Sequence, residues 1–598
     1  MLSRILRKLT GRSSPVAVAH QPLGSASAFA TSDSHAVALA DKPAEPTRKV
    51  DIYVEHAKWM ALAGEGRFDE AIGLCRAVID VPESNFVASL FLGHAYAQMQ
   101  QHADALKYLR AAVALSANDY YANLLLAHTE RAMGHDDEAL SLYMTCCELP
   151  VESIVEPFEA AMNIAMARRD MPEGVALSGL FDVLQAKAKL PLPLALKFLF
   201  FWRRDADLAC LLESMEEAGA GQKPSFRRIR SVKDWALESG EVYQSLGEPP
   251  SIRLVAPTEV YASDPHEQQV LASPPYLAEL RDVKIVSTSS LVYAGDGNVV
   301  SDVLADELYG SQVSLAYDKT VLAQRPDALL LAPIGITAHL DEGIMLSGLA
   351  SNAYGHWFAE FLPKLRHFEK HSRFSSLPII VDAQMPASHF DFIGALVPNP
   401  LYRLETGHAL SVGCLHVAPT TTFFPVELFR DHTVPPEHQA SWSEESMQYI
   451  KSKMAVRYPL PAQRSRRLFL SRKNSAWRLL RNEAEIIERL QDLGFESIFL
   501  EEYDFARQVR TFGEAEFIVA PNGSALNSLI FAATDVKALI LGQQNSFNWG
   551  GWLGPILDLG FKPEFMEGEA TESTSFKHSD YVVPADRVRA KVLAMLDS

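Results

Sequence analysis

The chain has few cysteines for its 598 residues. The five that it contains form no C-x-x-C pair. Secreted domains that depend on disulfide bonds use many cysteines in a defined framework, so this composition argues against a protein of that class. We therefore expect free thiols and a reducing compartment, the cytoplasm.

Positive charge is also scarce. The 55 lysines and arginines are outnumbered by 74 aspartates and glutamates, which gives a formal net charge of −19 at pH 7. Sequence-independent nucleic-acid binding requires clustered basic side chains that face phosphates, so nucleic acid is excluded as a partner. The hydrophobic content of 48% is that of ordinary globular domains. The length allows about three or four of them.

Long hydrophobic runs are absent as well. No segment reaches the roughly 18 uninterrupted apolar residues that a membrane-spanning helix needs. Residues 1–12 combine basic and aliphatic side chains at helical spacing, and residues 13–49 are rich in Ala, Ser and Pro. The first segment is either part of a disordered tail or a short helix on the inner face of a membrane. The lack of acidic residues before Asp33 also allows a transit peptide.

A 34-residue period runs through the region that follows. Ala71, Ala105 and Ala139 lie one period apart, as do the residues expected at the turns (Gly66, Gln100 and Gly134) and on the first helices (Trp59, Gly93 and Ala127). Small residues at this period are typical of tetratricopeptide repeats, in which each helical pair buries its apolar face against the next. We predict three such units and a degenerate fourth from Asn163 to Leu177.

The repeats indicate an interaction role rather than chemistry. The array either binds a peptide or protein partner in its groove or serves only as a spacer or dimer surface. An apolar patch at residues 198–202 would close it, before a linker. Asp205 and Asp207 resemble the D-x-D that holds a metal ion in some glycosyltransferases. Because a helix points such residues to different sides, we do not assign them a metal.

Beyond residue 248 the sequence changes to short strand-like runs. Near the C-terminus strands at 467–471, 497–500, 517–520 and 536–541 alternate with helices at 482–493, 504–515 and 524–533. Such alternation predicts right-handed βαβ units in a parallel sheet, whose ligands bind at the carboxyl ends of the strands.

Two of these strand ends are followed by polar loops. Arg472 follows one strand, and Asn522, Gly523 and Ser524 follow another. A helix that opens at Gly523 would offer backbone N–H groups to an anion, glycine would let a diphosphate approach closely, and Arg472 would add a permanent cation. Together these features predict a nucleotide-diphosphate site without a metal.

Several separated motifs resemble glycosyltransferase family 61. RLFLSR at 467–472, FARQV at 505–509 and PNGSALN at 521–527 are similar to the motif-bearing half of that family, and NAYGHWFAEFLPKL at 352–365 is similar to its upstream segment. The resemblance covers roughly residues 270–560. It implies a GT-B architecture of two Rossmann-like domains, a nucleotide-sugar donor, inversion at the anomeric carbon and no obligatory metal or other cofactor.

Three positions depart from the family pattern. Asn522 replaces the usual histidine of the phosphate-side loop, Glu360 replaces an aspartate, and Gly542 stands where an acidic residue often closes the last strand. Glu360 preserves a carboxylate. Asn522 preserves hydrogen bonding but cannot transfer a proton.

An inverting transfer needs a base for the acceptor hydroxyl and stabilisation of the departing diphosphate. His356 and Glu360 are the candidates for the base, because residues four apart share one face of a helix. Either could instead only anchor that helix. We assign substrate binding to the residues at the strand ends and in the matching motifs, namely Arg472, Asn522, Gly523, Ser524, Asn527, Gln508 and Asn352. For Gln508 the alternative is a solvent-exposed position on an amphipathic helix, without contact to the donor.

The leading hypothesis is a hexosyl- or pentosyltransferase whose repeats recruit a partner or acceptor, such as a polysaccharide, a glycolipid or a protein. The alternative is an interaction scaffold with a catalytically inactive transferase domain. We expect an α plus α/β chain with these boundaries: a tail at 1–49, repeats at 50–215, a linker at 216–250, the acceptor-side domain at 251–435 and the nucleotide-sugar domain at 436–598.

Overall fold

The computed structural model describes residues 51–598 except for 83, 151–152, 169–170, 188, 218–222, 249–250, 256–266, 272, 296, 306–313, 316, 421–442, 476–477, 544–556, 558 and 572–578. The tail predicted at 1–49, with its basic segment 1–12, lies outside the described residues. The chain divides into two compact units, Met1–Asp205 and Ala206–Ser598. Within the described ranges, no helix is both long and apolar enough to cross a membrane.

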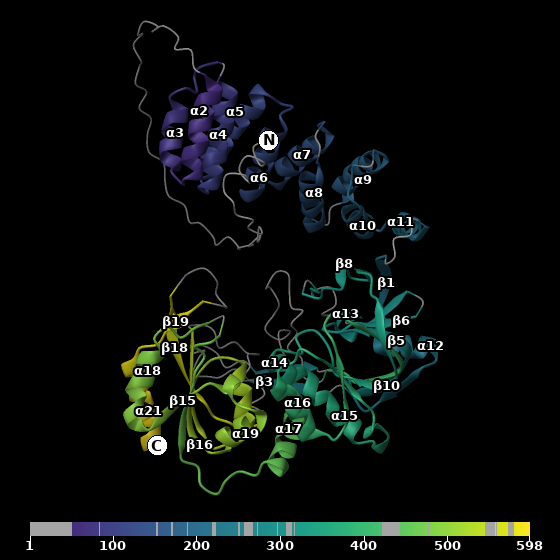
Figure 1. The fold of residues 1–598 in the computed structure, drawn as a ribbon, viewed down its shortest axis with the longest axis vertical. Helices are drawn as coiled ribbons and strands as arrows, with labels where there is room; N and C mark the ends of the chain where they lie inside the picture. Colours follow the sequence, from purple (N-terminus) through teal and green to yellow (C-terminus); the bar gives the residue numbers. More distant parts are fainter. Residues whose placement is uncertain are drawn as a thin grey trace. The chain divides into compact units, whose positions relative to one another are not determined.

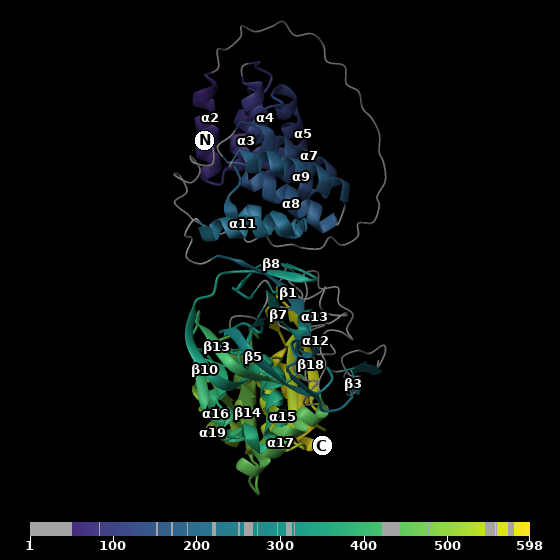
Figure 2. The same cartoon turned by 90° about the vertical axis from the view of Figure 1, so that its right-hand side faces the viewer.

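The first unit is an array of paired helices (Figure 1 and Figure 2). Its described helices are α2 (Ile52–Gly64), α3 (Phe68–Arg76), α4 (Asn85–Gln98), α5 (His102–Leu115), α6 (Tyr120–Ala132), α7 (Asp136–Glu148), α8 (Val155–Arg168), α9 (Met171–Ala186) and α10 (Leu192–Phe201). α11 (Asp205–Glu217) begins at the boundary between the units and carries the Asp205–Asp207 pair on a helix, as predicted.

Helix crossings explain the 34-residue period. Ala71, Ala105 and Ala139 lie on the second helix of successive pairs, and each is 0% exposed. At Gly93 on α4 a Cβ atom would lie 2.4 Å from Cγ of Leu109 on α5. The helices therefore cross too closely for a larger residue at these positions, which confirms the predicted repeat.

Turns between paired helices keep the same period. Gly66, Gln100 and Gly134 all have positive φ, at +79°, +59° and +81°. A left-handed residue at this point ends the first helix and reverses the chain. The fourth unit predicted from Asn163 to Leu177 begins within α8 and ends within α9. Arg203, with φ of +54°, stands between α10 and α11.

The second unit contains a mixed sheet of eleven strands among the residues that the structure describes. Its order is β12-β11-β10-β13-β5-β6-β7-β1-β9-β8, and β2 pairs with β5. β10 to β13 pair in parallel, whereas β13 runs antiparallel to β5. The strands are β1 (Ser225–Arg230), β2 (Val242–Ser245), β5 (Tyr276–Val286), β6 (Val292–Ala294), β7 (Asn298–Val300), β8 (Val321–Arg325), β9 (Ala328–Leu331), β10 (Ile336–Met345), β11 (Ile379–Asp382), β12 (Leu401–Leu404) and β13 (Ala409–Val417).

Two smaller features accompany this sheet. β3 (Ser251–Val255) and β4 (Glu267–Leu271) form a separate antiparallel pair. The short helix α13 (Asp302–Ala305) follows β7. Because antiparallel strands make up most of the sheet, the predicted pair of Rossmann-like domains is not confirmed for this half.

The linker predicted at 216–250 is wrong. β1 pairs with β7 and β9, β2 pairs with β5, and α12 (Val232–Ser239) lies between β1 and β2 in sequence. The charged side chains of β1 do not indicate a linker, because the Arg227 guanidinium bonds backbone carbonyl groups of the same sheet. Its Nη1 donates to the carbonyl oxygens of Ala294 at 2.8 Å and Asn298 at 2.9 Å.

The C-terminal half of this unit contains the predicted parallel sheet. Its order is β15-β14-β16-β17-β18-β19, and only the last pair is antiparallel. The chain moves from β14 outward to β15 and then returns to the other side of β14 as β16. In an open α/β sheet such a reversal is where ligands bind. The elements are β14 (Arg466–Leu470), β15 (Phe495–Ile498), β16 (Ala515–Pro521), β17 (Lys537–Gln543), β18 (Glu564–Ala570), β19 (Tyr581–Val582), α17 (Glu444–Arg457), α18 (Glu483–Leu490), α19 (Phe505–Gly513) and α21 (Ala585–Asp597).

One hydrophobic core joins the two sheets. Helix α16 (Ala387–Leu396) packs against α19 between them (Figure 1). The ring of Phe392 on α16 stacks on Phe505 of α19 at 4.5 Å and contacts Phe531 at 5.6 Å. This shared core holds the candidate site residues of both halves in fixed positions relative to one another.

Candidate functional site

The His356 segment is a helix of unusual form. It runs from α14 (Tyr354–His356) through a π-helical turn, η1 (Trp357–Phe361), and a 3₁₀ turn, η2 (Leu362–Lys364), into α15 (Leu365–Glu369). π-Helical turns are rare and occur frequently at functional sites. The change of helix type lies between the two residues that the sequence analysis proposed as bases.

His356 and Glu360 form a hydrogen-bonded pair. Nδ1 of His356 lies 2.5 Å from Oε1 of Glu360, and the histidine is only 7% exposed. An ionised carboxylate can only accept, so it bonds the tautomer that carries its proton on Nδ1 and its lone pair on Nε2. The prediction that both residues share one face is confirmed, and the pair has the chemistry of an oriented general base.

A buried aspartate fixes the loop that precedes this helix. Asp382 at the end of β11 is 0% exposed and accepts from Thr288 N at 2.7 Å, Gly348 N at 3.0 Å and Ser351 Oγ at 2.6 Å. Burial raises the pKa of this carboxyl above its usual value. Asn352, assigned to substrate, follows Ser351 and is exposed.

Histidine 389 supports the same helix from α16. Its ring stacks on Trp357 at 5.3 Å with an angle of 5° between the planes. Burial lowers the pKa of His389 to about 4, so the ring is neutral near pH 7. A neutral histidine can pack like an aromatic residue, which explains its place in the core.

In the C-terminal parallel sheet, Arg472 contacts the loop that follows β16. Its Nη1 donates to the carbonyl oxygen of Asn522. A Cβ atom at Gly523 would lie 2.0 Å from that same Nη1. Because φ of Gly523 is 171°, which any residue can adopt, glycine here leaves space for the guanidinium rather than serving a special backbone conformation. The two predicted strand-end loops therefore meet.

A second arginine completes a basic cluster that the sequence analysis missed. Arg478 has φ of +55°, and its buried Nε has no hydrogen-bond partner among the described residues. Burial lowers the pKa of Arg472 and of Arg478, and the charge of Arg472 lowers that of Arg478 further. Glu483 accepts from Ser471 Oγ and from Arg472 N, and its charge raises the pKa of Arg472 in part. Two half-buried guanidinium groups close to one another favour an anionic ligand.

Two amide side chains in the segment that follows β16 also have buried groups without a hydrogen-bond partner among the described residues. Asn527 is 0% exposed, and neither its Oδ1 nor its Nδ2 has a partner within the described part of the chain. Oδ1 of Asn522 is in the same state. Buried polar groups almost always have partners in folded proteins, so such a group indicates a ligand or an ordered water.

The helix predicted at 524–533 is present in a tighter form. It is the 3₁₀ helix η7 (Ser524–Phe531), and Ser524 is its first residue. The first N–H groups of a helix have no partner within the helix, so they can face an anion.

Two other residues change the picture drawn from the family pattern. Gln508 is buried rather than solvated, and its Nε2 donates to the carbonyl oxygens of Leu500 and Tyr503, both at 3.0 Å. Gly542 is paired with Glu567 on β18. Paired residues project to the same side of a sheet, so Glu567 places a carboxylate beside the position where the family often has one.

A hydrogen bond joins the two halves of the site. The hydroxyl of Tyr354, two residues before His356, lies 3.0 Å from Oγ of Ser528, one residue after Asn527. Burial raises the pKa of Tyr354 to about 12, so its hydroxyl is neutral at physiological pH. The segment of His356 and Glu360 and the segment of Asn522 and Asn527 are therefore held together by a direct hydrogen bond.

Comparison with known families agrees with this geometry. Residues 354–539 match the family Glycosyltransferase 61. The matched range begins at Tyr354 and contains both the His356–Glu360 pair and the arginine cluster. The resemblance drawn from the motifs is confirmed, and the match implies glycosyltransferase activity. Residues 88–119 match a tetratricopeptide repeat, which implies interaction with proteins.

None of the curated proteins compared with the chain matches it. Among solved structures, the first TPR of Spaghetti (RPAP3) bound to an HSP90 peptide is 24% identical, with a TM-score of 0.19, and the match covers 20% of this chain and 94% of that chain. MamA from Desulfovibrio magneticus RS-1 is 18% identical, with a TM-score of 0.20 and coverage of 23% and 75%. PcrH in complex with the chaperone-binding region of PopB is 14% identical, with a TM-score of 0.18 and coverage of 20% and 98%. Scores this low carry no argument about binding.

Proposed function

We propose that the chain is an inverting glycosyltransferase that moves a sugar from a nucleotide diphosphate to an acceptor hydroxyl. The hydrogen bond between Tyr354 and Ser528 carries the proposal. It joins the helix that holds the candidate base, His356, to the segment after β16 that would bind the diphosphate. A base and an anion site held in one assembly are what an inverting transfer requires.

The reaction is a single displacement. The acceptor oxygen attacks the anomeric carbon while the bond from that carbon to the diphosphate oxygen breaks, and the configuration at the carbon inverts. Nε2 of His356 takes the hydroxyl proton, and the carboxylate of Glu360 stabilises the imidazolium that forms. The electron pair of the broken bond leaves with the diphosphate.

The departing diphosphate is stabilised by Arg472, Arg478 and the first N–H groups of η7. The amides of Asn522 and Asn527 bond the nucleotide sugar, which accounts for their unused groups. Two half-buried guanidinium groups supply the positive charge that a divalent ion would otherwise give, so the transfer needs no metal or cofactor. An asparagine at 522 is sufficient because the diphosphate leaves as an anion and needs no proton.

The repeats recruit a protein partner or the acceptor, which is a polysaccharide, a glycolipid or a protein. The tetratricopeptide match supports this part of the proposal. All five cysteines are free thiols, which supports action in the cytoplasm.

Thermal stabilisation by a panel of UDP-, GDP-, CMP- and dTDP-sugars tests the donor site, with nucleotide release followed in the same samples. We expect one donor class to raise Tm, and Arg472→Ala or Arg478→Ala to abolish the rise. Arg464→Ala is the matched control, because Arg464 pairs with Asp535 at 2.5 Å on the surface of the same half. If no donor shifts Tm and no nucleotide is released, the inactive-scaffold alternative replaces this proposal.

A further inference from the structure

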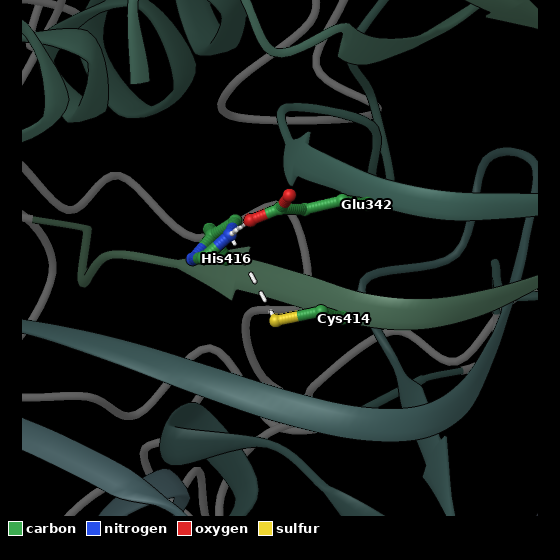
Figure 3. Close-up of side chains that lie close together, drawn as sticks. All are labelled: Glu342, Cys414 and His416. Atoms are coloured by element: carbon green, nitrogen blue, oxygen red, sulfur yellow. Dashed lines mark hydrogen bonds and ion pairs between the residues drawn. The ribbon is translucent and has the colours of Figure 1, made fainter. Parts of the chain in front are cut away.

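Three potential metal ligands converge on one face of the eleven-stranded sheet (Figure 3). Glu342 on β10 is paired directly with Cys414 on β13, and His416 lies two residues further along β13. Residues two apart on a strand, and residues opposite each other on paired strands, project to the same side. The register of β10 against β13 therefore brings the three side chains together.

The ligand atoms are already near the spacing that one ion requires. Nε2 of His416 lies 2.7 Å from Oε1 of Glu342 and 3.8 Å from Sγ of Cys414, and all three atoms lie within 4.8 Å of one another. Around a tetrahedral zinc ion, ligand atoms stand roughly 3.3–3.8 Å apart, given bonds of about 2.0–2.3 Å. The glutamate and histidine atoms need only a small separation to meet that spacing.

The cluster combines a fixed ligand with an adjustable one. His416 is 2% exposed, and its ring makes an edge contact with Phe374 at 5.0 Å. The side chain of Glu342 is 47% exposed, so it can rotate to accommodate an ion. A rigid imidazole with a mobile carboxylate is a suitable arrangement for a site that binds its ion after folding.

The surrounding charges do not oppose a cation. Glu279 on β5 is paired with His416, and its Oε1 accepts from Arg373 Nη1 at 2.9 Å. Burial raises the pKa of Cys414, and the charges of Glu279 and Glu342 raise it further. The charge of Arg281, which is paired with Cys414 on the neighbouring strand, lowers the pKa of Cys414.

We propose that Glu342, Cys414 and His416 bind a zinc ion that links β10 to β13. A thiolate, an imidazole and a carboxylate are the ligands that zinc prefers, whereas magnesium and calcium require oxygen ligands throughout. Three protein ligands leave the fourth position to water. The ion is a structural link on the strand that leads toward the His356 loop, and it takes no part in the transfer.

Cobalt(II) provides the direct test, because a thiolate ligand gives it a strong near-ultraviolet charge-transfer band. The full chain carries Cys210→Ser, which removes the exposed cysteine. We expect a single cobalt ion per chain, a thiolate band with tetrahedral visible bands, and displacement of the cobalt by zinc. Zinc should also raise Tm.

Variants identify the ligands. Cys414→Ser should remove the thiolate band, and Glu342→Gln should weaken cobalt binding by at least about tenfold, since loss of a second-shell partner alone costs about that much. In both variants the new side chain is close in size to the one that it replaces. A thermal melt checks that each variant is folded. His339→Gln is the matched control, because His339 is an exposed histidine of the same strand that pairs with Asp341 at 3.3 Å. The proposal is overturned if the parent shows no thiolate band, if Cys414→Ser keeps it, or if His339→Gln removes it.

Discussion

At the scale of single residues, the proposed site depends on close contacts between a few side chains and backbone groups. Gly523 leaves the space that the Arg472 guanidinium fills, and that guanidinium bonds the carbonyl of Asn522. His356 is oriented by one carboxylate at 2.5 Å. Each of these contacts can be removed without changing the core, so each yields a specific test.

Gly523→Ala should weaken donor binding strongly. The added methyl group would stand 2.0 Å from Nη1 of Arg472, and the guanidinium would have to leave its position. Gly394→Ala is the control, because Gly394 lies on α16 with nothing within 4 Å of an added Cβ. Isothermal titration with the donor found in the thermal screen measures both. Equal binding by Gly523→Ala and the parent would contradict the assigned position of the diphosphate.

His356→Gln should lower the transfer rate by about 10²–10⁴-fold, which is the usual contribution of a general base. Donor affinity should be unchanged, because His356 acts on the acceptor. Glu360→Gln should also lower the rate, since an amide no longer stabilises the imidazolium. Initial rates of nucleotide release at saturating donor measure the effect. A fall in donor affinity with an unchanged rate would mean that His356 only anchors the helix.

At the scale of elements, helix type and strand register decide what the sequence could reveal. The four-residue spacing of His356 and Glu360 predicted their contact, but nothing in it distinguishes an α-helix from a π-helical turn. Arg478 belongs to no motif, so only the folded loop brings it to Arg472. The Glu342 and Cys414 pairing spans strands about seventy residues apart, and no periodicity reports such a register.

Buried neutral histidines make helix packing sensitive to acid. Burial lowers the pKa of His389 to about 4 and that of His367 to about 3, from an ordinary value of 6.5. Both are protonated more readily in the unfolded chain, so the stability present above pH 6.5 is lost as pH falls toward 4. Each contributes a slope of about 1.4 kcal/mol per pH unit at most.

Calorimetric melting between pH 7 and pH 5 checks this prediction. His389→Phe keeps an aromatic ring against Trp357 but has no proton to gain, so its Tm should fall less with pH than that of the parent. His339→Gln, an exposed histidine, should follow the parent. A pH dependence that His389→Phe leaves intact would assign the acid sensitivity to other groups.

The close crossing of α4 and α5 in the repeats can be tested by adding a methyl group at Gly93. Gly93→Ala places a methyl group 2.4 Å from Leu109 and should destabilise the array by about 1–3 kcal/mol, as overpacking usually does. Gly73→Ala on α3 has open space and should be neutral or stabilising by up to about 1 kcal/mol. Circular dichroism melts compare the two, and a less stable Gly73→Ala would contradict the packing described.

At the scale of the whole molecule, a helical array precedes a second unit in the chain. The two large sheets of that second unit share one hydrophobic core. The array was predictable because a fixed period places small residues at every crossing. The parallel sheet was predictable because its strands and helices alternate. The eleven-stranded sheet was not, since charged strands such as β1 resemble a linker.

The central claim is that this two-sheet unit transfers a sugar with inversion. Proton NMR follows the anomeric proton of the sugar, starting from the donor that thermal stabilisation identifies. The sugar passes to acceptor or water while the nucleotide is released. The account predicts that the first product has the opposite anomeric configuration to the donor, and that His356→Gln slows its appearance. A first product of retained configuration, or an intact donor after prolonged incubation, would contradict it.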